Sequence, residues 1–306
     1  MIRAATAGVA LALCLLAGAG GAEVAAVTSQ NAGALTLVDT GSLQVLATLP
    51  LPGKPAAVAV DGRRGRILAV AVETARLHVF DLAGAPLADW PLSGAPFGLA
   101  IRPQTGMALV TDQAGNLLRE IDPVTGQELA QWQTGALPSG VAEAEGVILV
   151  ANRDGESVTL IRGAVQQQIP VGHHPFGVTL NDGRGFVTDV LSDQVSVIDL
   201  ASAAVIATIP TGERPYAVAF AAGRGFVTNQ YAASLTVFDA QSLAVIAEIA
   251  TDDYPEGIAA TTDGQILVAN WFSDTLQVID PVALQVNQTL DMPEGPRAFG
   301  AFVGGP

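Results

Sequence analysis

Cysteine and lysine are scarce in this chain, and each shortage excludes a class of function. The only cysteine among 306 residues is Cys14, inside an apolar N-terminal stretch. The rest of the chain therefore has no disulfide, no thiol nucleophile and no Cys-ligated metal. Lys54 is the only lysine, no basic run occurs, and the formal net charge is −15. Such a charge repels phosphate backbones and anionic membrane surfaces.

Sequence motifs for catalysis are missing too. The chain has no Ser-His-Asp spacing and no nucleotide-binding loop. Nucleic-acid binding is disfavoured by the charge, and only a local patch around Lys54, Arg214 and Arg297 would support it. Hydrophobic residues make up 50% of the chain and charged residues 14%. That composition is too apolar for disorder and sufficient for a large core.

Residues 1–22 form a separate segment. A single basic residue, Arg3, precedes an apolar stretch over 4–16, and residues 18–22 are all small. This order is typical of a secretory signal peptide. A membrane anchor is the alternative, but the Leu-rich part is short for a span and no basic cluster follows it. We expect cleavage, export to the periplasm or medium, no membrane span in the mature chain, and one domain over 23–306.

Seven prolines set a regular period in that domain. Consecutive members are 37 to 42 residues apart: Pro55, Pro96, Pro138, Pro175, Pro215, Pro255 and Pro296. A period near 40 in a turn-rich, apolar chain is typical of a β-propeller. The unit from Pro215 reads as four strands, at 215–220, 226–229, 235–239 and 244–249, with turn residues between them. Four short strands make one blade.

The second strands of the repeats end in related tetrapeptides. One is Phe226-Val227-Thr228-Asn229, and related forms end at Asp112, Asn152, Asp189 and Asn270. In these segments the chain resembles the YVTN-repeat β-propellers, the YncE-like family. The resemblance covers about residues 24–303. It implies a propeller fold and leaves the function open, because the roles of that family are varied.

The two ends of the domain give the number of blades. Six units lie between Pro55 and Pro296, while only three strands precede Pro55 and one, at 297–303, follows Pro296. We therefore predict an all-β, seven-bladed propeller of four-stranded blades. The C-terminal strand is expected to join the N-terminal blade and close the ring, which removes the free sheet edges.

Two repeated features have structural explanations. The second residue after each proline is small, alanine or glycine in all seven copies, because the inner strands converge there. Third strands end in aspartates that are expected to accept N–H bonds in the next turn. These residues are Asp39, Asp81, Asp122, Asp199, Asp239 and Asp280.

Residues that differ between repeats gather on one face. We call it the proline face: the loops that enter the inner strands, together with the loops between second and third strands. By analogy with other propellers, it surrounds the mouth of the central channel and is the expected ligand site. All three tyrosines and two of three histidines fall there. The candidate binding residues are Lys54, Phe97, His173, His174, Phe176, Asp189, Arg214, Tyr216, Tyr231, Tyr254, Glu256, Trp271 and Arg297.

The chemistry of these candidates is mixed. Lys54, Arg214 and Arg297 are suited to a carboxylate or phosphate, and the aromatic residues to a flat ligand. His173 and His174 are the best candidates for a metal or haem ligand, or for a general base. Adjacent side chains diverge, so one metal would need partners such as Asp189 or Glu256. No spacing matches a known zinc or calcium site.

We expect an exported, monomeric binding or scaffold protein that holds a small molecule or a protein partner at the channel mouth. A periplasmic enzyme of the quinoprotein-dehydrogenase or lactonase type, which shares the seven-bladed architecture, is the alternative. Nucleic-acid binding is the third possibility. The sequence identifies no cofactor and no catalytic set.

Overall fold

The computed structural model describes residues 23–305, so the expected signal peptide lies outside the described residues. Strands make up nearly all of its regular structure. They are β1 (Val24–Ser29), β2 (Ala34–Asp39), β3 (Val45–Pro50), β4 (Pro55–Asp61), β5 (Arg66–Ala71), β6 (Arg76–Asp81), β7 (Pro86–Pro91), β8 (Pro96–Ile101), β9 (Ala108–Asp112), β10 (Leu117–Ile121), β11 (Glu128–Gln133), β12 (Pro138–Ala144), β13 (Val147–Asn152), β14 (Ser157–Arg162), β15 (Val165–Pro170), β16 (Pro175–Asn181), β17 (Arg184–Asp189), β18 (Gln194–Asp199), β19 (Ala204–Pro210), β20 (Pro215–Ala221), β21 (Arg224–Asn229), β22 (Ser234–Asp239), β23 (Val245–Ala250), β24 (Pro255–Ala260), β25 (Ile266–Asn270), β26 (Thr275–Asp280), β27 (Gln285–Asp291) and β28 (Val303–Gly304). Two short 3₁₀ turns, η1 (Gly62–Arg64) and η2 (Arg153–Gly155), are the only helical segments within 23–305.

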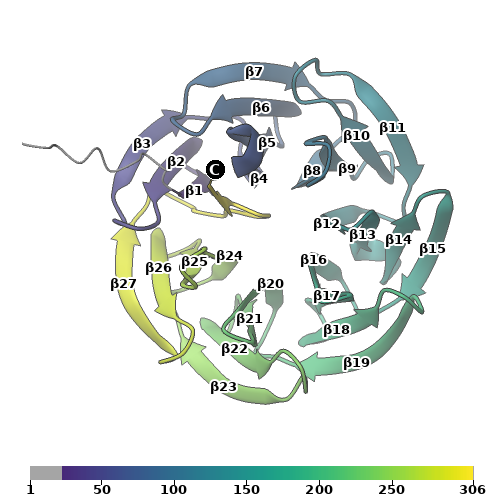
Figure 1. The fold of residues 1–306 in the computed structure, drawn as a ribbon, viewed down its shortest axis with the longest axis vertical. Coiled ribbons are helices and arrows are strands. Elements are labelled where there is room, and N and C mark those ends of the chain that lie inside the picture. The colour runs from purple at the N-terminus through teal and green to yellow at the C-terminus, as the bar shows by residue number, and fades with distance from the viewer. Residues whose placement is uncertain (1–22, 306) are drawn as a thin grey trace, which may run out of the picture.

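Seven four-stranded antiparallel sheets stand in a ring around a central axis (Figure 1). Six blades use four consecutive strands each, from β4–β7 to β24–β27, and the seventh has the order β28-β1-β2-β3. The predicted seven-bladed propeller is therefore confirmed. Strands β1 and β2 are buried on both pleat faces, whereas β3 is largely exposed. The first three strands of a blade lie between neighbouring blades, while the fourth forms the rim of the ring.

The ring is closed by the C-terminal segment, as predicted, but with a shorter strand than expected. Of this segment, only the two residues of β28 form a ladder with β1, pairing Val24 with Gly304 and Ala25 with Val303. The stretch 297–302 is irregular, because Ala298 and Gly300 have positive φ values of 46° and 118°. Its backbone carbonyls accept hydrogen bonds from two strands, β1 and β4. Ala26 N donates to the carbonyl of residue 302 over 2.8 Å, and Val58 N donates to that of residue 299 over 2.9 Å. The segment thus joins the first and last blades directly.

The threonine of the YVTN-like tetrapeptide links adjacent blades. In the blade β16–β19, Thr188 Oγ1 accepts the Gly177 N–H over 2.8 Å and donates to the Tyr216 carbonyl of the next blade over 2.9 Å. Thr28, Thr111 and Thr228 make the equivalent pair of bonds. This threonine therefore joins the inner strands of two adjacent blades by hydrogen bonds at the crowded centre of the ring.

The small residues after the prolines have the predicted cause. A Cβ added at Gly98 would lie 2.0 Å from the Ser139 carbonyl oxygen, and one added at Gly177 would lie 2.2 Å from that of Tyr216. These oxygens belong to the backbone of the next inner strand and cannot move aside.

The aspartates that end the third strands also behave as predicted. Each accepts at least one backbone N–H bond in the following turn, as when Asp199 Oδ1 accepts the Ser202 N–H over 2.7 Å. The other five do the same. They are therefore turn residues of the face opposite the prolines.

No helix within residues 23–305 is long and apolar enough to cross a membrane. The hydrophobic core is divided into clusters that lie between blades, such as the one around Phe186 and Phe238. Because each blade shares its apolar faces with two neighbours, the ring is one structural unit.

Candidate functional site

Aromatic side chains close the central channel at the proline face. Phe97, Phe176 and Tyr216 each directly follow the proline that begins an inner strand. Phe299 comes from the C-terminal segment. The Phe176 ring lies 4.5 Å from that of Tyr216, 5.1 Å from that of Phe299 and 5.7 Å from that of Phe97, measured between centroids. We call these four residues the aromatic plug. Phe176 and Tyr216 are buried in it.

A polar network covers the plug. Arg297 donates from Nε and Nη2 to the Tyr216 hydroxyl over 2.9 and 2.8 Å, and its Nε lies 3.0 Å from Glu256 Oε2. The other oxygen of Glu256 accepts from Gln230 Nε2 over 2.8 Å, and Arg297 Nη1 donates to Gln30 Oε1 over 3.2 Å. The guanidinium also lies 5.7 Å from the Tyr216 ring centroid. Glu256 Oε2 has this ion-pair contact and no hydrogen-bond partner among residues 23–305.

Burial controls the protonation of this network. It raises the pKa of the Tyr216 phenol, so the hydroxyl stays protonated and can donate. Burial also raises the pKa of the Glu256 carboxyl, although Arg297 opposes that shift. The network is thus a compact, desolvated closure of the channel, and its arginine already has an anionic partner.

A second aromatic group lies outside the plug and remains accessible. Tyr231, Tyr254, Trp271 and Phe272 belong to the loops of two adjacent blades, and their ring centroids are 4.6 to 5.8 Å apart along the chain of contacts. Tyr231 is 58% exposed and Phe272 63%. Burial and a hydrogen bond with Tyr231 raise the pKa of Tyr254 to about 12, so its hydroxyl is neutral at physiological pH. We call these four residues the aromatic shelf.

Arg214 borders the aromatic shelf. Its guanidinium carbon lies 5.4 Å from the Tyr231 ring centroid, in a cation–π arrangement. Within residues 23–305 no carboxylate is within ion-pair distance of this guanidinium, unlike that of Arg297. Like His174 and Tyr254, Arg214 has a positive φ, here 59°, and directly precedes a proline. A loop in that conformation would form more easily with glycine, so a side chain is kept there at some conformational cost.

The two histidines occupy a hollow further around the face. It has a volume of about 440 Å³ and is lined by Arg153, Asp154, Glu156, His173, His174 and Leu191. His173 Nδ1 lies 2.7 Å from Glu156 Oε1 at the surface. Burial lowers the pKa of His174, and the positive charges of Arg153 and Arg214 lower it further, which favours a neutral imidazole near pH 7. No group of three or more His, Cys, Asp or Glu side chains suited to a metal is found in 23–305.

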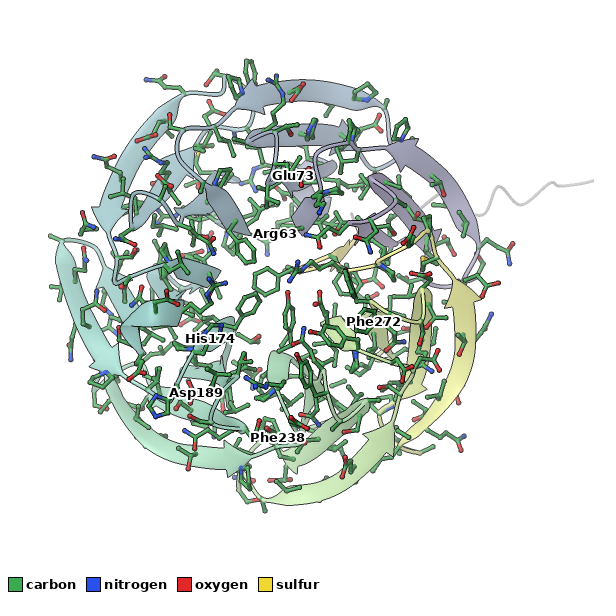
Figure 2. The ribbon with its side chains drawn as sticks, turned by 180° about the vertical axis from the view of Figure 1, so that it is seen from behind. Arg63, Glu73, His174, Asp189, Phe238 and Phe272 are labelled. Carbon is green, nitrogen blue, oxygen red and sulfur yellow. The ribbon has the colours of Figure 1, made fainter. Side chains whose placement is uncertain are left out.

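Two of the sequence-predicted residues lie away from the other candidates. Lys54 points to Glu73, with 3.5 Å between Nζ and Oε1. Asp189 is fully buried inside its own blade, where Oδ2 accepts from Ser196 Oγ over 2.7 Å and from Gln194 Nε2 over 3.0 Å. Figure 2 shows Asp189 further from the centre of the ring than His174. The remaining candidates form the plug, its polar network, the shelf and the histidine hollow.

Sequence reasoning missed Phe299, Gln30 and Gln230 as members of these groups. Phe299 is the third residue after its proline, where the other repeats have Val or an aliphatic residue such as Leu99. The glutamines directly follow second strands, at a position that Gln113 shares. Both departures could have been found by comparing the repeats position by position.

Comparisons with known proteins support the fold and no specific activity. No protein-family model matches the chain, and no curated protein matches its sequence. Among solved structures, a protein of unknown function from Desulfotomaculum acetoxidans is 13% identical, with a TM-score of 0.77 and coverage of 92% of this chain and 98% of its own. Virginiamycin B lyase from Staphylococcus aureus is 17% identical, with a TM-score of 0.69 and coverage of 81% and 92%. The dihydro-heme d1 dehydrogenase NirN is 17% identical, with a TM-score of 0.67 and coverage of 88% and 63%.

The chain is a β-propeller like these. At 13 to 17% identity the likeness extends to the fold alone, and it is shared by enzymes and by a protein without known function. The function of this propeller has to be argued from its own side chains.

Proposed function

We propose that this propeller is a binding protein whose proline face holds a flat, anionic small molecule. The aromatic shelf supplies the surface on which a planar ring stacks, and Arg214 supplies the charge for a carboxylate or phosphate beside it. The observation that carries the proposal is the guanidinium of Arg214, which has no ion-pair partner within residues 23–305 and lies 5.4 Å from the Tyr231 ring, at the edge of four clustered aromatic residues.

Physical chemistry favours this class of ligand. Exposed tyrosine and tryptophan rings offer a large apolar area with little rotamer entropy to lose. Hydrogen bonds from a guanidinium to an anion are about twice as strong as those between neutral groups. In a chain with a formal charge of −15, a half-buried cation that has no counter-ion in the described part of the chain is a local exception. Arg297, by contrast, is already neutralised by Glu256.

An NMR titration tests the proposal. The protein has three tryptophans, and the indole N–H signal of Trp271 is assigned with the variant Trp271→Phe. Titration with 2-naphthoate should shift the Trp271 signal in a saturable way, whereas 2-naphthylmethanol, which lacks the charge, should bind more weakly. Arg214→Gln should raise the Kd for naphthoate about tenfold, the equivalent of ~1.4 kcal/mol, and leave that for the alcohol unchanged.

Arg66→Gln is the matched control, because Arg66 begins β5 at the opposite end of a blade. Its Kd for naphthoate should equal that of the unmodified protein. Equal affinities for naphthoate and the alcohol, or an Arg214→Gln variant that binds naphthoate normally, would contradict an anion site at Arg214. A Trp271 signal that does not move would contradict the aromatic shelf as the site. If the shelf instead contacts a protein, the naphthoate titration also fails.

We also propose that the mature protein is exported, a proposal that rests on the composition of residues 1–22. N-terminal sequencing of the protein from its native host, after separation of cytoplasm, periplasm and medium, tests it. A start close to residue 23 in an extracytoplasmic fraction is expected. A mature chain that keeps Met1 in the cytoplasm contradicts it.

Membership of the YVTN-repeat group is a further part of the proposal. The roles of Thr228, which links two blades, and of Asn229, which donates to Ser234 Oγ and Thr236 Oγ1, give the tetrapeptide a structural reason to recur. An alignment of homologues that retains these two positions across repeats would support it.

Catalysis is the second candidate function, and His174 is the observation that favours it. A neutral, half-buried imidazole in a hollow with Arg153 is suited to act as a general base beside an anion-binding group. Turnover of a lactone or another ester panel that is abolished by His174→Ala, and kept by His173→Ala, would establish this function.

A further inference from the structure

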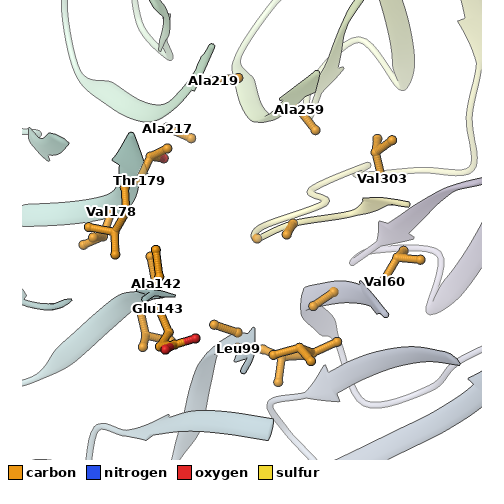
Figure 3. A pocket seen from close by; sticks show the side chains of 18 of the residues that line it. Val60, Leu99, Ala142, Glu143, Val178, Thr179, Ala217, Ala219, Ala259 and Val303 are labelled. Carbon is orange, nitrogen blue, oxygen red and sulfur yellow. The ribbon is translucent and has the colours of Figure 1, made fainter. Parts of the chain in front are cut away.

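The central channel forms a large cavity on the face opposite the prolines. Its volume is about 630 Å³, and it is lined by the later residues of the inner strands and by the C-terminal segment. Figure 3 shows the side chains around it, most of them small and apolar. They include Leu99, Ala142, Val178, Ala217, Ala219 and Ala259.

The cavity ends at the aromatic plug. Phe299 is one of its lining residues, and this ring packs at 5.1 Å on Phe176 and at 5.5 Å on Tyr216. The other members of the plug do not line the cavity. It is therefore a blind pocket that opens on one face, separate from the aromatic shelf on the other.

The size and walls of the pocket suit an apolar ligand. Pockets for small molecules commonly measure about 300–1,000 Å³ and are mainly apolar. At about 30 Å³ per water molecule, this pocket would hold roughly 20 waters, most of them beside alanine and valine side chains. Replacing such poorly bonded water with hydrocarbon is favourable.

The polar groups of the pocket differ in how well they are satisfied. The Thr179 hydroxyl donates to the Val218 carbonyl over 2.7 Å, and Asp61 is paired with Arg64 at 3.1 Å. Glu143 Oε1 accepts only the Gly146 N–H, over 2.8 Å, and no cationic side chain in 23–305 forms an ion pair with this carboxylate. Its second oxygen has no hydrogen-bond partner in the described part of the chain.

Glu143 is therefore the carboxylate of the pocket that has no counter-ion within residues 23–305. The terminal torsion of a glutamate is broad, so either oxygen can turn toward a ligand. Arg63 also lines the pocket, but it is exposed, where water satisfies a guanidinium at little cost. A carboxylate beside an apolar wall is more poorly solvated, and a cation beside it stabilises it more.

We propose that the channel is a second binding site, for an elongated apolar ligand that carries one ammonium group. The hydrocarbon part lies in the channel between the inner strands, and the ammonium group lies beside Glu143. This site is independent of the one proposed on the proline face, since the plug separates them.

Displacement of a fluorescent dye tests the proposal with the folded chain. N-phenyl-1-naphthylamine should bind at one saturable site with a rise in fluorescence. Decylamine, decanol and decanoate, each below its micelle concentration, should displace it in that order. A charge-assisted contact predicts that decylamine binds about tenfold more tightly than decanoate.

Three variants locate the site. Ala142→Phe fills the channel and should weaken dye binding at least about tenfold, the equivalent of ~1.4 kcal/mol. Ala201→Phe makes the same change in an exposed turn and should leave binding unchanged. Glu143→Gln should keep dye affinity and remove the advantage of decylamine over decanol. If Ala142→Phe fails to fold, Ala144→Phe, nearer the rim, replaces it.

The outcomes that overturn the proposal are separate from those for the proline face. Dye binding that Ala142→Phe or Ala144→Phe leaves intact places the dye outside the channel. A preference for decanoate would mean that Arg63 rather than Glu143 selects the head group. In Ala142→Phe, naphthoate should still shift the Trp271 signal, so either proposal can fail while the other stands.

Discussion

The guanidinium of Arg297 and the carboxylate of Glu256 lie 3.0 Å apart at the centre of the ring, although they come from different blades. Glu256 follows the proline that begins β24, and Arg297 follows the proline that precedes the C-terminal segment. The Glu256 side chain is 4% exposed and that of Arg297 17%. An ion pair this poorly solvated connects the sixth blade to the segment that closes the seventh.

Removing one member of this pair should destabilise the protein strongly. Arg297→Met leaves the Glu256 carboxylate buried without its counter-ion, and the expected loss of unfolding free energy is about 3–5 kcal/mol. Chemical denaturation monitored by tryptophan fluorescence measures it.

The double variant Glu256→Gln/Arg297→Met is the control for the charge. It should be more stable than Arg297→Met alone, because no uncompensated charge remains. A double variant as unstable as the single one would show that lost packing on Phe97 and Tyr216, and not the charge, explains the effect.

The threonine link between blades predicts a smaller effect. Thr228→Val removes the hydroxyl that accepts from Ala217 N over 3.1 Å and donates to the Glu256 carbonyl over 2.9 Å. Leaving these buried groups unsatisfied should cost about 1–3 kcal/mol of unfolding free energy. Thr208→Val, on the exposed outer strand β19, should change stability by less than about 0.5 kcal/mol. Equal effects of the two variants would exclude a role for the hydroxyl at Thr228.

The repeat explains why the fold was predictable from sequence. Pro55 and five of its counterparts mark the start of an inner strand, and Asp199 and its five counterparts fix the turn after six of the seven third strands through backbone N–H groups. Both depend on local geometry, which recurs in six of the seven blades. A local interaction repeated about every 40 residues is visible as a pattern in a single chain.

The site was less predictable, since its contacts join different repeats. The Arg297–Glu256 pair depends on two side chains turning toward each other across a blade boundary, which no periodicity encodes. Asp189 was expected at the mouth but turns into its blade, because Ser196 and Gln194 offer it hydrogen bonds there. The irregular path of residues 297–302 follows from positive φ at Ala298 and Gly300, where a regular strand was expected.

The closing segment should be essential for stability. Phe302 is fully buried, and its carbonyl accepts from Ala26 N in β1. Phe302→Ala should lower the unfolding free energy by about 3–5 kcal/mol, through lost burial and the cavity left behind. Phe272→Ala, a change of the same size at a residue that is 63% exposed, is the control and should be nearly neutral. A thermal unfolding scan of both variants compares them, and similar midpoints would contradict ring closure through Phe302.

Three of the turn aspartates predict how stability depends on acid. Hydrogen bonds from a serine three residues later lower the pKa of Asp39, Asp199 and Asp239. For Asp39 and Asp199 the serine hydroxyl has the larger effect and the serine N–H the smaller one. For Asp239 the N–H of Ser242 has the larger effect and its hydroxyl the smaller one. A folded-state pKa below the ordinary value of 3.8 means that ionised aspartate stabilises the fold above that pH. This stabilisation is lost as the pH falls below 3.8 through the folded-state pKa values.

The triple variant with asparagine at these positions should therefore lose less unfolding free energy between pH 6 and pH 3 than the unmodified protein. Asparagine at the exposed residues Asp154, Asp182 and Asp291 is the matched control. If both triple variants have the same acid dependence, hydrogen bonds in the turns do not determine it.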